Sequence, residues 1–321
     1  MRFTLDSEQR LFAETVRDLL SGADVCGAAR AWGRGDHAPG RALWRALADA
    51  GVFALAVPEE HGGAGVRPVE LVAALIEVGR HGVPGPVVET LAAAQVLGDP
   101  KALAGIADGS LAATLALPPL VPYALDADAA DLVLTVHGDA LHRAEPAGGP
   151  HRSLDPARRL FSCSPAGEIA SAESSPSATA AEFAALACAA QALGAGRRLL
   201  DATVAHVRTR EQFGCPIGEF QAVQHRLADT LIELEFAGSL VYGAAVAHSG
   251  PDSARDASAA KAAASEAAYR AARTALQLHG AIGYTDEFDL SLWIRKARAL
   301  HTAWGSPAHH RGRVMAALTG K

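Results

Sequence analysis

An arginine and an aromatic residue lie where a long helical segment gives way to a turn. Arg210 and Phe213 follow a helical pattern and stand beside Gly214 and Pro216, which favour a turn. At a helix end, a guanidinium offers paired donors to phosphate oxygens, and an aromatic ring can pack against a planar ligand. This placement suits a ligand-binding site, although these two residues taken alone favour an ordinary exposed arginine and a core phenylalanine.

Two glycines end the last of three long helical segments. Gly280 and Gly283 follow the pattern that runs over 252–278, and Gln277 stands just before them. Glycine tolerates left-handed backbone and lets main-chain N–H groups approach an anionic group closely. Since a plain helix C-cap needs only one glycine, the pair indicates a second anion-binding element.

The order and spacing of these elements resemble the C-terminal domain of the acyl-CoA dehydrogenases. Arg-x-x-Phe-Gly at 210–214 precedes Phe-Gln at 220–221, and Gln-x-x-Gly-x-x-Gly-Tyr begins at 277. In that family these elements hold the FAD bound mainly by the neighbouring subunit. The resemblance implies the same role for six residues here, which are Arg210, Phe213, Gln221, Gln277, Gly280 and Ala281. Ala281 stands where the family has a second glycine, a change that affects the pyrophosphate contact.

The resemblance also places a tryptophan where many relatives carry the catalytic glutamate. The usual Tyr-Glu-Gly-Thr turn reads Ala-Trp-Gly-Ser over 303–306, and the indole of Trp304 cannot act as a base. Some relatives place the glutamate on the first long C-terminal helix, but that position is Ala184 here. Glu182 lies about 200° around the helix from it and faces elsewhere. No catalytic residue is therefore expected on this chain, and the base is expected on a partner.

Two other charged clusters could carry chemistry. Glu233 and Glu235 lie mid-helix among apolar neighbours and are the candidates for a relocated base, with a solvated or interface face as the more ordinary interpretation. His309 and His310 beside Arg311 could form a basic spot for CoA phosphate, although such a cluster is more often a polar helix end.

Helical periodicity surrounds a short segment with strand character. Helical patterns cover 6–103 and resume at 180, with β-like runs such as 132–136 between them. The sequence predicts a mainly α protein with a small β unit. By resemblance, the order is that of the acyl-CoA dehydrogenases. Its expected parts are an N-terminal helical domain over 1–108, a reduced middle β domain over 109–175 and a C-terminal four-helix-bundle-type domain over 176–321. Long helices are expected over 180–208, 220–248 and 252–278.

Composition narrows the class of protein. The 321 residues are half apolar, enough to bury a substantial core, and the net charge of −6 with scattered arginines argues against nucleic acid. The N-terminus lacks an apolar signal core, so a cytoplasmic protein without membrane attachment is expected. Four cysteines lie far apart, so free thiols are expected rather than a metal site or disulfides.

The family elements that this chain keeps and those that it lacks suggest a specialised subunit. Elements expected to act across a subunit interface are kept, whereas those by which a relative binds its own flavin are degraded; Ala-Leu-Pro-Pro at 116–119 is at best a remnant of one. The resemblance implies a shortened subunit that pairs with a full-length acyl-CoA dehydrogenase-like chain as a heterotetramer. By analogy with paired forms in sterol side-chain breakdown, the expected substrate is a steroid-CoA ester, with an electron-transfer flavoprotein or similar acceptor. The alternatives are a stand-alone homo-oligomer with a relocated base and a flavin-free structural or regulatory subunit.

Overall fold

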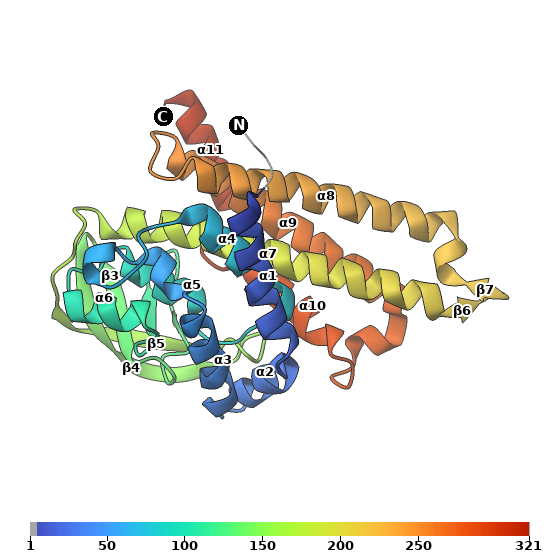
Figure 1. Ribbon diagram of the computed structural model, residues 1–321, viewed down its shortest axis with the longest axis horizontal. Coiled ribbons are helices and arrows are strands. Elements are labelled where there is room, and N and C mark those ends of the chain that lie inside the picture. The colour runs from blue at the N-terminus through green and yellow to red at the C-terminus, as the bar shows by residue number, and fades with distance from the viewer. Residues whose placement is uncertain (1–4, 321) are drawn as a thin grey trace.

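Six helices form the first part of the chain in the computed structural model, which describes residues 5–320 (Figure 1). The Asp6–Gln9 capping box predicted from the sequence is confirmed: the Gln9 N–H donates to Asp6 Oδ1 at 2.9 Å, and the Asp6 N–H donates to Gln9 Oε1 at 3.1 Å. The helices are α1 (Ser7–Ser21), α2 (Val25–Gly33), α3 (Ala38–Asp49), α4 (Pro68–His81), α5 (Val87–Ala94) and α6 (Pro100–Ala107), with 3-10 turns η1 (Phe53–Ala56) and η2 (Glu59–His61) between α3 and α4.

A five-stranded sheet follows. Its strands are β1 (Ala113–Ala116), β2 (Ala124–Leu125), β3 (Leu132–His137), β4 (Ala140–His151) and β5 (Leu160–Glu168), in the order β1-β3-β4-β5-β2. β1 pairs with β3 in parallel, and the other pairs are antiparallel. The outer halves of β4 and β5 are exposed, contain proline and glycine, and pair through register shifts, so the sequence gives little strand signal for them.

Five helices form the second helical part. They are α7 (Pro176–Thr209), α8 (Gln221–Val246), α9 (Ser253–His279), α10 (Leu290–Thr302) and α11 (Pro307–Thr319). The three predicted long helices are confirmed, with ends shifted by up to four residues, and so is the fold class. Between α7 and α8 lie the two-residue strands β6 (Glu211–Gln212) and β7 (Cys215–Pro216) and the 3-10 turn η3 (Ile217–Glu219). This hairpin projects at the end of the molecule opposite the sheet (Figure 1).

One hydrophobic core joins the two helical parts. Where α4 crosses α7, a Cβ added at Gly79 would overlap the carbonyl oxygen of Gln191, and one added at Gly194 would overlap that of Ile76. Glycine is required there because the two backbones touch. The alanine-rich face of α9 packs against α7 in the same core.

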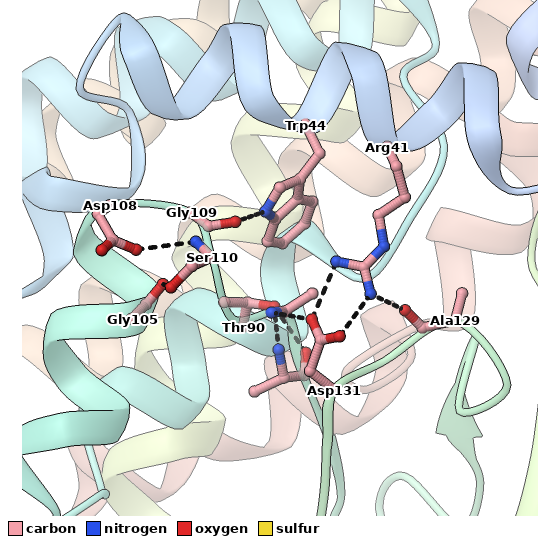
Figure 2. Close-up of polar contacts among 11 residues, drawn as sticks. Arg41, Trp44, Thr90, Gly105, Asp108, Gly109, Ser110, Ala129 and Asp131 are labelled. Carbon is pink, nitrogen blue, oxygen red and sulfur yellow. Dashed lines mark hydrogen bonds and ion pairs between the residues drawn. The ribbon is translucent and has the colours of Figure 1, made fainter.

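Polar contacts fix the helices on the sheet (Figure 2). Arg41 on α3 holds both oxygens of Asp131 at 2.9 and 3.0 Å. The hydroxyl of Thr90 on α5 donates to the Ala113 carbonyl at 2.6 Å and accepts the Ala113 N–H at 3.0 Å. This pair anchors α5, the helix that carries Glu89, on β1.

One described helix, α7, has the length and apolar content that a membrane span would need, and 83% of its apolar window is buried inside the protein. A central bundle helix has the same composition. The strands of the sheet lie between residues 113 and 168. The expected boundaries after 108 and 175 stay predictions.

Candidate functional site

The hairpin after α7 presents Arg210 and Phe213 to solvent. Phe213 is 94% exposed and has a left-handed backbone with φ of 55°, while Gly214 beside it has φ of 85°. The backbone of Arg210 connects α7 with η3. Its N–H donates to the His206 carbonyl at 2.9 Å, and its carbonyl accepts the Ile217 N–H at 2.8 Å. An aromatic side chain that is both exposed and backbone-strained is typical of a functional contact.

A groove of about 960 Å³ lies between α8 and α9 and brings together three of the predicted residues, Gln277, Gly280 and Ala281. Gly280 has φ of 64°, and a Cβ added there would meet no atom within 4 Å, so its backbone borders open space. Gly283 lacks the left-handed backbone expected of it; it is buried and packs close to Leu276. Gln221 is exposed at the start of α8, beside the groove, whereas Arg210 and Phe213 lie on the hairpin outside its lining.

Arginines missed by the sequence argument line the same groove. Within residues 5–320, the guanidinium groups of Arg226 and Arg273 make no ion pair and no hydrogen bond, while Arg270 pairs with Glu233. The remaining charged or titratable side chains of the lining are His225, Asp229 and Tyr284. Positions 270, 273 and 277 share one helix face by their three- and four-residue spacing, which is the signal that could have identified them.

The two candidates for a relocated base are both held by arginines. Glu233 pairs with Arg270, and Glu235 lies 3.3 Å from Arg197. Neither of them lines the cavity beside Trp304.

Trp304 is a buried structural residue. It is 2% exposed, it has a left-handed backbone with φ of 56°, and its indole N–H donates to Glu89 Oε1 at 3.1 Å. Glu89, absent from the sequence argument, is the one carboxylate that lines the adjoining cavity of about 420 Å³. No sequence pattern reveals this contact, because 215 positions separate the two residues.

A buried lysine and a buried histidine hold the turn around Trp304. Lys261 Nζ donates to the carbonyls of Leu300 and Gly305 at 3.0 and 3.4 Å, and burial lowers its pKa. His310 lies 2.8 Å from the Trp304 carbonyl through Nε2, and burial lowers its pKa to about 4. Since a carbonyl only accepts, Nε2 carries the proton of a neutral ring.

The basic spot for CoA phosphate is not assembled. His310 is buried beneath Trp304, Arg311 pairs with Glu266 on α9, and His309 alone of the two histidines is exposed. The more ordinary interpretation, a polar helix end, describes the cluster. The four cysteines are free thiols, and no group of three metal-ligating side chains occurs within the described part of the chain.

Two family models match the chain. The N-terminal domain model of the acyl-CoA dehydrogenases covers residues 6–102, and the C-terminal domain model covers residues 177–319. Acyl-CoA dehydrogenase IpdE2 of Mycobacterium tuberculosis is 35% identical over 316 residues, which are 95% of each chain. The chain therefore belongs to the acyl-CoA dehydrogenase family.

Solved structures share its fold. A variant of the Tcur3481–Tcur3483 steroid ACAD superposes with a TM-score of 0.87 at 24% identity and covers 99% of both chains. The ChsE4–ChsE5 complex from Mycobacterium tuberculosis gives 0.82 at 22% identity and covers 100% of both chains.

FAD is the cofactor of this family of oxidoreductases. The groove suits its phosphates, because Arg226 and Arg273 have free donors and Gly280 leaves its backbone accessible.

Proposed function

We propose that this chain is the non-catalytic subunit of a heteromeric acyl-CoA dehydrogenase and supplies the cross-subunit half of the FAD site to a full-length partner. The observation that carries the proposal is the state of Trp304. At the position of the catalytic glutamate, a buried indole donates to Glu89, so the nearest carboxylate is already engaged.

The flavin half-site combines the groove and the hairpin. Gln277 and Gly280 would hold the phosphates, Arg226 and Arg273 would neutralise them, and the exposed ring of Phe213 would pack against the cofactor. Arg210 and Gln221 lie at the two ends of the segment that joins α7 to α8 and contains the hairpin. When bound, FAD would supply the hydride acceptor for α,β-dehydrogenation of the acyl thioester, and the base for the α-proton would belong to the partner.

An apolar stripe on α8 supplies the partner surface. Ile232, Phe236 and Leu240 recur every four residues on one helix face, and Phe236 is 70% exposed. Ile282 and Tyr284 are also exposed in the turn after α9. A contiguous apolar face of this kind favours burial against another subunit. The fold shared with the ChsE4–ChsE5 complex supports a partner of the same family.

The proposed substrate is a steroid-CoA ester, and the proposed electron acceptor is an electron-transfer flavoprotein or a similar protein. The substrate assignment is supported by the fold shared with a steroid ACAD. The other candidate, a stand-alone enzyme that uses Glu233 or Glu235, would first have to break an ion pair with Arg270 or Arg197.

Flavin content of the assembled complex tests the half-site. The chain is co-expressed with a full-length relative, and FAD per heterodimer is measured for the wild type and for an Arg226→Gln/Arg273→Gln double variant. Loss of two charge-assisted contacts is expected to weaken FAD binding at least about tenfold. The matched control is Arg45→Gln, an exposed arginine on α3. Full flavin retention by the double variant would contradict the proposed half-site.

A further inference from the structure

The cavity beside Trp304 has an apolar wall. It lies between the end of α10 and the segments that lead into β2 and β5. Leu120, Leu125 and Leu160 line it, and its volume of about 420 Å³ is large enough for a small ligand. It shares no lining residue with the groove between α8 and α9, so its occupant and the flavin are separate questions.

A mostly buried guanidinium faces this cavity without a hydrogen-bond partner. The side chain of Arg158 is 14% exposed and forms an ion pair with Glu89 Oε1 at 3.8 Å, which is too long for a hydrogen bond. Within residues 5–320, its side-chain donors make no hydrogen bond. A guanidinium carries five N–H donors, and leaving them unpaired in a buried place is unfavourable. The arginine is therefore oriented for an acceptor that enters the cavity.

The charge of the lining favours an anion. Three arginines line the cavity, Arg152, Arg158 and Arg298, against one carboxylate, that of Glu89. Glu89 is already engaged by the Trp304 indole, and Arg298 also lies over the Tyr269 ring. The positive groups therefore outnumber the negative one at an otherwise apolar site.

We infer that this cavity is a second ligand site, which binds an amphipathic carboxylate. The anionic head pairs with Arg158, whose planar fork matches the two oxygens of a carboxylate. The apolar body lies against the leucines and Trp304. No bond is made or broken there, because no unpaired carboxylate or other base lines the cavity. The inference does not depend on the flavin half-site.

Titration calorimetry of the purified chain with decanoate tests the inference. Decanol has the same chain length without the charge, and free coenzyme A supplies phosphates without the apolar body. Decanoate is expected to bind, decanol and coenzyme A at least tenfold more weakly. Arg158→Gln should raise the decanoate Kd at least tenfold, which corresponds to about 1.4 kcal/mol. The control Arg143→Gln removes an exposed arginine on β4, outside the cavity, and should change nothing.

A second variant tests the cavity independently, in case Arg158→Gln does not fold. Ala299→Phe fills the cavity from α10, keeps every charge, and is expected to abolish decanoate binding. Any of three results would overturn the inference: no decanoate binding, equal binding of decanol or coenzyme A, or unchanged binding in a folded cavity variant.

Discussion

Acidification should weaken the fold through His310. Burial is the main cause of its depressed pKa, and the nearby charges of Lys261, His309 and Arg313 lower it further, against the hydrogen bond to the Trp304 carbonyl, which raises it. The folded pKa is about 4 against an ordinary value of 6.5. Because the unfolded chain takes up the proton first, stability is full above 6.5 and is lost progressively as the pH falls toward 4.

The size of the effect follows from the two pKa values. Between about pH 7 and about pH 5, proton uptake by the unfolded chain at this one site lowers the free energy of unfolding by about 2 kcal/mol. Other groups titrate in the same range, so the contribution of His310 is the difference between the wild type and His310→Gln, which keeps a donor but cannot become charged.

Urea unfolding at the two pH values measures this difference. The wild type should lose about 2 kcal/mol more than His310→Gln. His309→Gln removes the exposed neighbouring imidazole and is the matched control, for which a smaller difference is expected because its ring lies in solvent. Parallel pH dependence of the wild type and His310→Gln would refute the view that a neutral, buried imidazole holds the Trp304 turn.

Three further predictions concern packing, charge and strain. Gly194→Ala should destabilise the chain by about 3 kcal/mol or more in urea unfolding, because the new methyl overlaps the Ile76 carbonyl. Gly243→Ala, where the added methyl meets no atom, should stabilise the chain by about 0.5 kcal/mol. Equal effects would contradict the close crossing of α4 and α7. Burial raises the pKa of Asp126 to about 7, so the stability that its protonated carboxyl contributes is lost as the pH rises through that value. Asp126→Asn should therefore raise the thermal midpoint above pH 7. No gain there would count against a buried charged form. Phe213→Gly relieves a left-handed backbone and should leave the stability of the chain alone unchanged or raise it by up to about 1 kcal/mol, while it lowers flavin content in the complex; unaltered flavin would exclude the ring from the site.

Local patterns were sufficient for most of the fold. The capping box at Asp6 and the three long helices follow from periodicity and end signals, which depend on neighbours in sequence. The outer half of β4 could not be predicted in this way. Its Glu-Pro-Ala-Gly-Gly-Pro run at 145–150 has poor strand propensity and is extended only because β5 pairs with it.

Contacts between distant segments account for what the sequence argument missed. Glu89 meets Trp304 across 215 positions, and neither residue carries a local signal for the other. His310 is adjacent to Arg311 in sequence, but the helix turns one inward and the other outward. By contrast, Gln277 and Gly280 were accessible to sequence reasoning because the family motif keeps them close together in the chain.

Native mass combined with the flavin absorbance spectrum shows whether this chain needs a partner to bind FAD. The chain is purified alone and then co-expressed with a full-length acyl-CoA dehydrogenase. We expect little flavin on the lone chain, and a stable heterotetramer with bound FAD only when the partner is present. A yellow homotetramer of this chain, with one FAD per subunit and turnover of an acyl-CoA, would contradict it.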